Sequence, residues 1–350
     1  MGKTCFVAVS GGVDSAVSLS LLKENGYDVR GITMLPFGKE LVPDFDAKEL
    51  SDASSLCASL GVPHITLGLE KEFFEKVIKN FCDCYAAGET PNPCVVCNKY
   101  IKFGALADYS YKNGAELFAT GHYVKTLLQG DRKVIAKAKY KEKDQSYMLW
   151  MLSPAQIENF IAPLGDMSKD EVRAYAEDKK ISVAHKGDSQ DICFIQGGDY
   201  RSFLNRVAGD TDEVGDFVHI SGKILGKHLG QRRYTLGQRK GLGVAYTEPL
   251  YVVGRDIKKN QIILGSDADL FKTRFTVKNA NFLALDAPKS DLSCLVRVRY
   301  HAPDVECVIR PLGDDRYLVE TSAPVRAATP GQSAVFYQDD ILLGGGIIEG

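Results

Sequence analysis

The segment Ser-Gly-Gly-Val-Asp-Ser at residues 10–15 constrains the fold most, because it joins a short apolar run at 5–9 to a helical pattern at 13–23. Two glycines where a strand meets a helix let the backbone approach an anion closely. The N–H groups of the loop and of the helix start then supply partial positive charge. The segment therefore predicts a phosphate-binding turn. It differs from the phosphate loop of kinases and GTPases, which requires Gly-Lys-Ser or Gly-Lys-Thr.

The acidic residue of this turn, Asp14, predicts a bound metal ion. A bare carboxylate beside phosphates would repel a nucleotide, whereas Mg²⁺ prefers oxygen ligands and bridges the two. We therefore expect Asp14 to be a Mg²⁺ ligand.

The first half of the chain alternates between strand and helix patterns. Strands are expected at 5–9, 29–34, 64–67 and 116–120, and helices at 13–23, 47–60, 70–85 and 101–111. Such alternation predicts an α/β fold, in which a parallel sheet is covered by helices on both faces. Residues 124–129 and 134–139 are expected to pair as a hairpin. Ser168 and Glu171 have the spacing of a capping box, which predicts a helix from there to about residue 180.

From about residue 210 the pattern changes to short, alternating, β-branched runs separated by Gly, Asn and Asp, as at residues 295–299. This pattern predicts one or two small β domains behind the α/β domain. No run of 18 apolar residues exists, and the start of the chain has no signal-peptide cleavage site, so we expect neither a membrane-spanning nor an exported protein. Nine cysteines, an odd number, indicate cytosolic thiols rather than a disulfide framework, and we expect a cytoplasmic protein.

A basic segment stands out in a chain whose net charge is −2. Residues 221–260 contain nine lysines and arginines but only two acids, Glu248 and Asp256. A polyanionic partner would explain this excess, and so would a solvated surface balanced by acids from elsewhere in the fold.

Three cysteines lie in polar or turn-rich segments. Residues 90–103, Thr-Pro-Asn-Pro-Cys-Val-Val-Cys-Asn-Lys-Tyr-Ile-Lys-Phe, predict a rigid turn that delivers Cys94 and Cys97 to a helix start. A helix N-terminus lowers the pKa of a thiol, so Cys97 is a candidate thiolate nucleophile. A further thiol, Cys193, lies in Ser-Gln-Asp-Ile-Cys-Phe-Ile, and Gly121 ends a predicted strand where the backbone could meet a ligand.

These segments together carry a family resemblance. Residues 10–15 resemble the PP-loop of the ATP pyrophosphatases, which adenylate a carbonyl oxygen and release pyrophosphate. With residues 90–103, residues 189–195 and Tyr-Thr-Leu-Gly-Gln-Arg-Lys-Gly-Leu-Gly at 234–243, essentially the whole chain resembles the tRNA-specific 2-thiouridylase family, MnmA. The resemblance implies that ATP adenylates the C2 carbonyl of the wobble uridine, position 34 of the glutamate, glutamine and lysine tRNAs, before a persulfide replaces oxygen with sulfur.

The resemblance also implies roles for individual residues. Cys193 would carry the persulfide, and Cys97 would release the sulfur by closing a transient Cys97–Cys193 disulfide. ATP contacts are implied at Ala8, Val9, Ser10, Gly11, Gly12, Val13, Asp14, Ser15, Met34 and Gly121. Target-base contacts are implied at Asn92, Pro93 and Cys94, and other tRNA contacts at His122, Lys143, Asp144, Gln145, Arg299, Tyr300 and Gln332. The partners would be the tRNA and a sulfur donor, either a persulfide-carrying protein or a cysteine desulfurase.

On this basis we expect three domains. They are an ATP-binding catalytic domain with a tRNA-binding helical part at 1–203, a small basic central domain at 204–264 and a C-terminal β-barrel at 265–350. The basic segment is then expected to form part of the tRNA-binding surface, and tRNA binding should weaken as the salt concentration rises.

Cys94 departs from the family pattern, because many members have Asp at this position. Three interpretations are open: Cys94 packs near the site, or it joins Cys97 and Cys193 in holding a 4Fe–4S cluster, or it is a spare thiol in the persulfide relay. Asp191 could supply a replacement carboxylate. A four-thiol zinc site of Cys82, Cys84, Cys94 and Cys97 is a further idea, although residues two apart on a helix point to different faces.

Two other functions remain open from the sequence. Another PP-loop ligase or amidotransferase, acting on a small molecule, would need ATP but neither Cys97 nor Cys193. A non-catalytic tRNA-binding protein would keep the basic segment and release no pyrophosphate.

Overall fold

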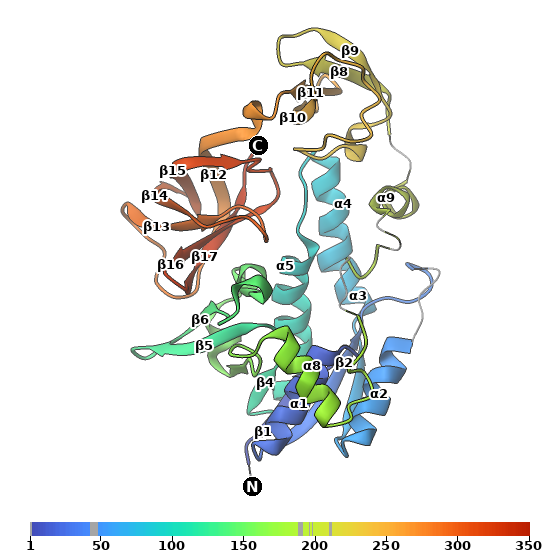
Figure 1. Ribbon diagram of the computed structural model, residues 1–350, viewed down its shortest axis with the longest axis vertical. Helices are drawn as coiled ribbons and strands as arrows, with labels where there is room; N and C mark the ends of the chain where they lie inside the picture. The colour runs from blue at the N-terminus through green and yellow to red at the C-terminus, as the bar shows by residue number, and fades with distance from the viewer. Residues whose placement is uncertain (1, 43–47, 188–191, 196, 198, 210–211) are drawn as a thin grey trace.

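A five-stranded parallel sheet forms the base of the molecule, and β1 lies at its centre in the order β3-β2-β1-β4-β7 (Figure 1). The structure is a computed structural model that describes residues 2–42, 48–187, 192–195, 197, 199–209 and 212–350. The strands are β1 (Thr4–Ala8), β2 (Asp28–Leu35), β3 (His64–Gly68), β4 (Leu117–Ala119) and β7 (Phe160–Ile161). Residues 5–7 are fully buried, as expected for a parallel strand covered on both faces.

The sheet places the predicted phosphate-binding turn at a switch point. β1 pairs with β2 on one side and with β4 on the other, both in parallel register. Ligands of open α/β sheets bind at the carboxyl ends of the strands where the strand order reverses. Residues 10–15 follow β1 at that edge.

Helices cover the sheet and extend away from it toward the rest of the molecule. α1 (Val13–Glu24) and α2 (Lys48–Ser59) are separate helices. Two longer helical segments each contain a π-helical stretch. One consists of α3 (Glu70–Phe73), η1 (Phe74–Ile78) and α4 (Lys79–Ala86), and the other of α5 (Pro93–Cys97), η2 (Asn98–Leu106) and α6 (Ala107–Lys112). The other helices in the described residues of this part are η3 (Lys141–Lys143), η4 (Ser146–Leu149), α7 (Pro154–Glu158), α8 (Lys169–Asp178) and α9 (Tyr200–Ala208).

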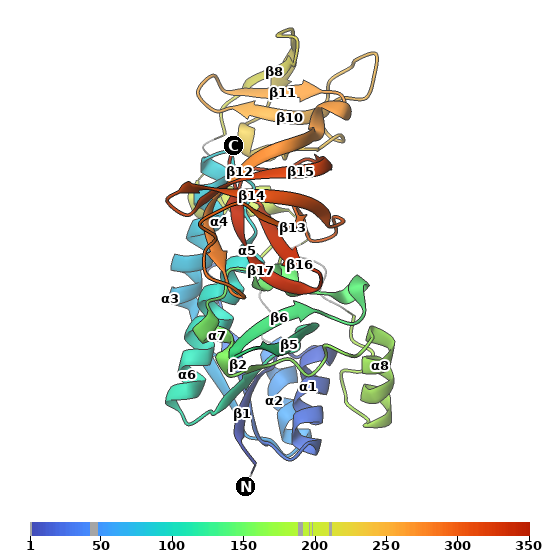
Figure 2. The same ribbon diagram turned by 90° about the vertical axis from the view of Figure 1, so that its left-hand side faces the viewer.

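A small central β domain lies at the far end of the molecule from β1 (Figure 2). Its sheet has the order β10-β11-β8-β9 and encloses its own apolar core, which includes Phe217, Val252 and Ile262. The elements are β8 (Gly215–His219), β9 (Ile224–His228), η6 (Gln231–Arg233), β10 (Tyr251–Asp256) and β11 (Gln261–Gly265).

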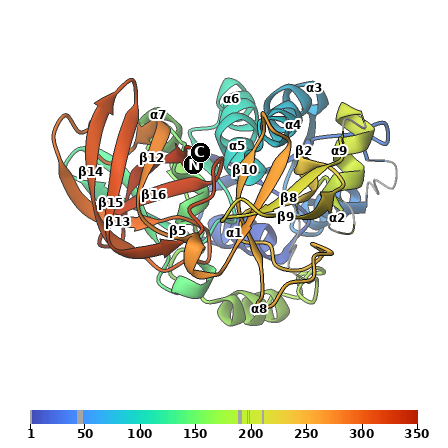
Figure 3. The same cartoon turned by 90° about the horizontal axis from the view of Figure 1, so that it is seen from above.

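The C-terminal part is a closed six-stranded barrel. Its strand order is β12-β15-β14-β13-β16-β17, and β17 pairs with β12 to close the ring. After η7 (Ala268–Leu270) the strands are β12 (Phe271–Phe282), β13 (Leu292–Arg297), β14 (Val305–Gly313), β15 (Arg316–Arg326), β16 (Ser333–Gln338) and β17 (Ile341–Ile348). Seen from above, the barrel lies beside helices α4 and α5 (Figure 3).

The barrel and the α/β part share a junction. The hairpin of β5 (Val124–Gln129) and β6 (Arg132–Lys137) joins β17 through the pair Ile341 and Ala136. One apolar cluster continues across the junction, from Phe118 of the sheet to Leu283 and Val335 of the barrel. The two parts therefore have a common core.

A buried ion network reinforces the junction. The Lys137 ammonium lies 2.7 Å from an Asp304 oxygen and 4.2 Å from the centre of the Tyr337 ring. Arg297 binds Asp304 at 2.7 Å and Asp144 at 3.3 Å. These charges link the β6 hairpin and the loop containing Asp144 to the barrel.

The predicted parallel sheet, C-terminal barrel and hairpin 124–139 are confirmed, and so is the capping box of Ser168 and Glu171. One helix prediction was wrong at its start. The helix expected from 101 begins at Pro93, because Asn92 caps it and proline is favoured in the first turn. Among the described residues, no helix has the length and apolar character needed to span a bilayer.

Replacing Lys137 by Met should destabilise the protein by about 2–4 kcal/mol, because a buried partner of Asp304 is lost. Arg132→Met is the matched control, since its ion pair with Asp286 is exposed to solvent, so its loss should change stability little. Chemical denaturation followed by tryptophan fluorescence measures both. Equal effects of the two substitutions would contradict the buried network.

Candidate nucleotide and thiol site

The turn after β1 has the geometry of an anion cradle. Gly11 has φ of +72°, and Gly12 precedes the first residue of α1 without a side chain that could cap it. The first N–H groups of α1 therefore remain available to an anion at the positive end of the helix dipole. The Ser15 hydroxyl accepts from the Ser10 N–H at 3.1 Å and donates to the Gly12 carbonyl at 3.0 Å, which holds the turn in shape.

Met34, on β2, is half-buried beside this edge, whereas Val9 and Val13 are buried. Ala8 and Ser10 flank Val9 at the end of β1, and Ala8 is half-buried. The two valines can therefore contribute to a nucleotide site through their backbone atoms only.

Asp14 points to charged and polar partners within the protein. Its Oδ1 accepts from the Tyr123 hydroxyl at 2.6 Å, and the Lys169 ammonium lies 2.7 and 2.9 Å from its two oxygens. Mg²⁺ requires free oxygen ligands in octahedral geometry. In this arrangement Asp14 does not fit as a Mg²⁺ ligand, since the Lys169 cation occupies both of its oxygens.

A second cation, Lys186, also reaches the turn. Its ammonium donates to the Gly11 carbonyl and to Asp52, both at 3.1 Å. Sequence reasoning missed Lys169 and Lys186, which lie far along the chain from residue 11. A signal for Lys169 was present, because a lysine directly after the N-cap Ser168 occupies a position where the helix dipole favours acids.

The loop after β4 contacts the phosphate-binding turn at residues 10–15, called the nucleotide turn from here on, through Gly121. A Cβ added to Gly121 would lie 2.9 Å from the Asp14 carbonyl carbon and 2.9 Å from the Ser15 nitrogen. Only glycine permits this backbone approach. The contact places the next residue, His122, beside the nucleotide turn.

His122 is neutral and faces the helix that carries the thiols. Burial lowers its pKa well below the ordinary value, and the Lys102 cation lowers it further. Its Nδ1 is 2.7 Å from the Thr120 hydroxyl, and its ring lies 6.0 Å from that of Phe103 on η2. A neutral imidazole can donate a hydrogen bond to a nucleobase and accept one from it without adding charge to the site.

Cys97 lies deeper than the sequence predicted. It is the fifth residue of α5, beyond the first turn, and only 7% of its surface is exposed. The expected lowering of its pKa was wrong: burial raises the pKa of Cys97 to about 11, and the Lys102 ammonium on η2 opposes part of that rise. Desolvation outweighs the helix dipole, which acts mainly within the first turn.

Cys94 is exposed at the start of the same helix. Crowding by the surrounding protein nevertheless raises its pKa, and Lys102 again acts in the opposite direction. Asn92 caps the helix by accepting from the Val95 N–H, and Pro93 is buried at the first helical position.

Cys193 lies on a turn anchored by its neighbours. The thiol-bearing residue is exposed, while Phe194 and Ile195 are buried in the apolar cluster that also contains Cys97. Phe194 packs edge-on against Phe81 at 5.2 Å. Both thiol-bearing segments therefore border one core. Asp191, considered as a replacement carboxylate, is outside the described residues.

The proposed metal sites do not form in the described part of the chain, where no three His, Cys, Asp or Glu side chains are grouped to hold an ion. The zinc quartet of Cys82, Cys84, Cys94 and Cys97 was thus wrong. The three thiols Cys94, Cys97 and Cys193 likewise do not converge as a ligand set for an iron–sulfur cluster.

The predicted tRNA contacts at 143–145 divide into buried and accessible residues. Asp144 is only 3% exposed, and it accepts from the Ala138 N–H, the Ser146 hydroxyl and Arg297. A direct tRNA contact by this carboxylate is inconsistent with that burial, because all its interactions are internal. Gln145 pairs with the Tyr123 backbone, and Lys143 is half-buried.

The barrel supplies the other predicted contacts. Arg299 is half-buried and donates to the carbonyls of Arg326 and Ala327, and Tyr300 packs near Tyr147. The Gln332 amide donates to the carbonyls of Thr90 and Pro91, both at 3.0 Å. Gln332 thereby holds the loop that leads to Asn92.

Several cations of the basic segment, residues 221–260, form ion pairs or hydrogen bonds within the protein. Arg232 and Arg233 pair with Asp212. Arg255 is half-buried and donates to the Gly88 and Tyr234 carbonyls, and two lysines form ion pairs with acids (Lys227 with Asp216, Lys259 with Asp256). Lys223, Arg239, Lys240 and Lys258 are exposed, and no ion pair involves them within the described residues. Gly237 lies next to the Arg299 and Arg326 guanidinium groups, so the segment meets the barrel at a predicted tRNA contact.

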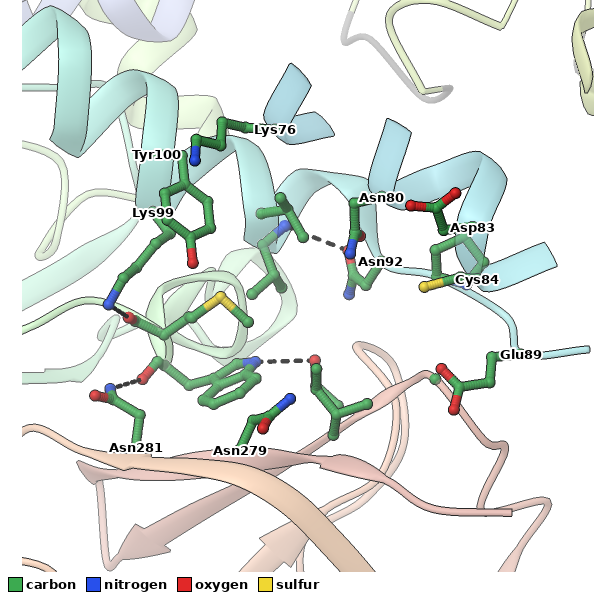
Figure 4. Close-up of a pocket in the computed structure, with 18 of the residues that line it drawn as sticks. Lys76, Asn80, Asp83, Cys84, Glu89, Asn92, Lys99, Tyr100, Asn279 and Asn281 are labelled. Carbon is green, nitrogen blue, oxygen red and sulfur yellow. Dashed lines mark hydrogen bonds between the residues drawn. The ribbon is translucent and has the colours of Figure 1, made fainter. Parts of the chain in front are cut away.

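A cavity of about 610 Å³ lies between the thiol-bearing helix and the barrel. Figure 4 shows Lys99, Tyr100 and Asn92 on the helical side and Asn279 and Asn281 on the barrel side. Neither Cys94 nor Cys97 lines it. The cavity therefore lies on a different side of this helix from Cys94 and Cys97.

Three protein-family models match the chain. They are described as a tRNA methyl transferase HUP domain, over residues 3–197, a tRNA methyl transferase PRC-barrel domain, over 201–266, and an aminomethyltransferase beta-barrel domain, over 272–348. The chain is 44% identical to tRNA-specific 2-thiouridylase MnmA 1 of Caldanaerobacter subterraneus subsp. tengcongensis, covering 98% of this chain and 97% of that protein. It is also 44% identical to tRNA-specific 2-thiouridylase MnmA of Syntrophotalea carbinolica, covering 99% and 98%.

Among solved structures, the chain is similar to the U34-tRNA thiolase NcsA from Methanococcus maripaludis with its 4Fe–4S cluster. The likeness has a TM-score of 0.36 at 19% identity and covers 59% of this chain and 63% of that chain. A likeness of this degree carries no inference about chemistry or cofactor.

Gly121→Ala should raise the Kd for ATP at least about tenfold, equivalent to about 1.4 kcal/mol, because the added methyl group pushes the loop away from the nucleotide turn. Isothermal titration calorimetry with ATP measures the effect. Gly226→Ala is the control, since it lies in the central domain, its φ is ordinary and the nearest described atom to a Cβ there, on Val244, is 4.0 Å away. Unchanged ATP affinity in Gly121→Ala would show that the contact does not shape the site.

Alkylation of Cys97 by iodoacetamide should accelerate about tenfold per pH unit between pH 7 and 9, because the reactive thiolate is a minor form below a pKa of about 11. Lys102→Met should slow the reaction at fixed pH by removing the opposing positive charge. Lys99→Met serves as control, since its ammonium donates to the Met151 carbonyl. Mass spectrometry of the Cys97 peptide, in a Cys94→Ser background, gives the rates. A rate that is independent of pH would contradict the buried, protonated thiol.

Proposed function

Because the chain belongs to the tRNA-specific 2-thiouridylase family, we propose that it converts the C2 carbonyl of uridine 34 in tRNA into a thiocarbonyl at the expense of ATP. The enzyme is thus a tRNA-uridine 2-sulfurtransferase that yields 2-thiouridine, AMP and pyrophosphate. The observation that supports this most directly is a juxtaposition. The anion cradle at residues 10–15 touches the loop of Gly121 and His122, which faces the helix carrying Cys97.

The nucleotide turn would serve the first step. The N–H groups of the turn and of the α1 start bind the ATP phosphates, while Lys186 and Lys169 supply positive charge on the same side. The uridine C2 oxygen attacks the α-phosphorus, an O–P bond forms, and pyrophosphate leaves. This adenylate converts a poor leaving group into AMP.

Sulfur transfer would use the two thiol-bearing segments. The terminal sulfur of a Cys193 persulfide attacks C2, and the Cys97 thiolate then attacks the Cys193 sulfur. The sulfur–sulfur bond of the persulfide breaks, a Cys97–Cys193 disulfide forms, and the sulfur left on C2 expels AMP as the C=S bond closes. Because burial holds Cys97 protonated, it needs a base in the substrate complex, and Lys102 favours the resulting thiolate.

The reaction also needs a metal ion and a sulfur donor. ATP is expected to arrive with Mg²⁺, as phosphate chemistry requires, but Asp14 can serve the ion only if Lys169 moves onto the phosphates. The sulfur comes from a persulfide-carrying protein or a cysteine desulfurase, and the exposed position of Cys193 suits such an exchange. Of the roles considered for Cys94, a thiol beside the target base or in the relay fits its exposed position.

For the tRNA, we propose contacts by Asn92, Pro93, Cys94, His122, Lys143, Gln145, Arg299, Tyr300 and Gln332. The domain division 1–203, 204–264 and 265–350 is supported by the apolar clusters inside the central domain and inside the barrel, and the barrel also shares the junction cluster with the first domain. The exposed cations Lys223, Arg239, Lys240 and Lys258 are placed to meet phosphates. A target base must leave its stack to reach the thiols.

The decisive assay incubates the enzyme with tRNA, ATP and a persulfide donor, without S-adenosylmethionine, and quantifies 2-thiouridine and pyrophosphate. Cys193→Ser and Cys97→Ser should each lower 2-thiouridine formation at least about 100-fold, since each removes a sulfur nucleophile. Adenylation, measured as pyrophosphate release, should survive the Cys193→Ser change. Cys84→Ser is the control, because that thiol lies on α4 outside the proposed site.

Two results would point elsewhere. Full turnover in both cysteine variants would favour a different PP-loop ligase or amidotransferase. An absence of tRNA-stimulated pyrophosphate release would favour a non-catalytic tRNA-binding protein.

A further inference from the structure

Two cysteines that the sulfur-transfer reaction does not use lie side by side in the barrel. Cys294 on β13 is directly opposite Cys307 on β14 in the antiparallel register, and their Sγ atoms are 3.5 Å apart. Residues opposite each other in antiparallel strands have Cα atoms about 4.5–5.5 Å apart. Disulfides span Cα separations of about 4.4–6.8 Å, so the backbone is already in bonding range.

The pair is accessible from one side. Cys294 is 9% exposed and Cys307 5% exposed. Both line a cavity of about 520 Å³, whose other lining residues include Glu306, Thr321 and Asp339. A small reagent can therefore reach the thiols without unfolding of the barrel, and the acidic groups at the cavity favour a neutral or cationic one.

We propose that Cys294 and Cys307 form a redox-modifiable dithiol, oxidised to a disulfide by a cationic or neutral low-molecular-weight disulfide, independently of the Cys97–Cys193 pair. Cys294, the more exposed of the two, attacks one sulfur of the reagent and releases the first small thiol. Cys307 then attacks the Cys294 sulfur, the Sγ–Sγ bond forms, and the second small thiol leaves. Two protein thiols are oxidised, the reagent is reduced to two thiols, and the two protons pass to them.

Local electrostatics favour persistence of the oxidised state. The interaction with Cys294 raises the pKa of Cys307, and burial adds to that rise. When the reduced state contains a stabilised thiolate, oxidation loses that stabilisation and the disulfide is easily reduced. A dithiol that stays protonated has no such stabilisation to lose, so its disulfide is harder to reduce. The disulfide would close only a short stretch of chain between β13 and β14 and hold two strands that are already paired.

The test treats the reduced full-length protein with cystamine, blocks the remaining thiols with N-ethylmaleimide and digests it with trypsin without reductant. The two cysteines lie on separate tryptic peptides, residues 290–297 and 300–316, and neither peptide contains another cysteine. We expect the cross-linked peptide pair in the parent protein. It should persist in a Cys97→Ser, Cys193→Ser double variant and disappear in Cys294→Ser and in Cys307→Ser.

Cys57→Ser is the matched control, because Cys57 is also buried and its replacement should leave the cross-link unchanged. Phenylarsine oxide gives a second readout that leaves Cys294 and Cys307 themselves unchanged. The reduced protein with Cys97 and Cys193 replaced should bind one arsenical, with two As–S bonds formed and one water released, and cystamine pretreatment should abolish that binding. Recovery of the two peptides as separate labelled thiols or as separate cysteamine adducts would overturn the proposal, whatever the thiolation activity.

Discussion

The helix at residues 93–112 is enclosed by the parallel sheet on one side and by the turn at 146–152 and the barrel on the other. Phe103 packs against Phe118 and Phe160 of the sheet, while Lys99 and Asn98 donate to carbonyls of that turn. The helix carries Lys102, whose charge acts on both Cys97 and His122, and residues of this helix line the cavity in Figure 4. Its π-helical stretch η2 is a rare conformation that is frequent at functional sites.

Burial governs the chemistry along this helix. Burial removes water from the site and so disfavours charged side chains. It lowers the pKa of His122, which stays neutral, and raises the pKa of Cys97, which stays a thiol. The positive charge of Lys102 lowers the pKa of Cys94, Cys97 and His122. It opposes the effect of burial at the two thiols and adds to it at His122. Reactivity at Cys97 is therefore suppressed until a substrate or a base changes its surroundings.

The sequence was sufficient for features with a local cause. Strand and helix periodicity predicted the parallel sheet, and glycines at a junction predicted the anion cradle. Features produced by tertiary packing were out of reach. The pKa of Cys97 depends on how deeply the helix is buried, the inward pairing of Arg232 and Arg233 depends on Asp212, and Lys169 meets Asp14 only because α8 packs on α1. The burial of Asp144 has the same origin, since Arg297 comes from the barrel.

The network of Lys137, Asp304, Arg297 and Asp144 has a consequence for how an RNA is read. Arg297 precedes the 299–300 turn, and Asp144 lies within the 143–145 loop, so this network fixes the spacing between two segments that we place on the anticodon arm. A rigid protein frame cannot fold itself around a poorly fitting loop. The nucleic acid must then deform to fit, and among tRNAs with uridine 34 those with easily deformed anticodon arms would be admitted ahead of those with stiff ones.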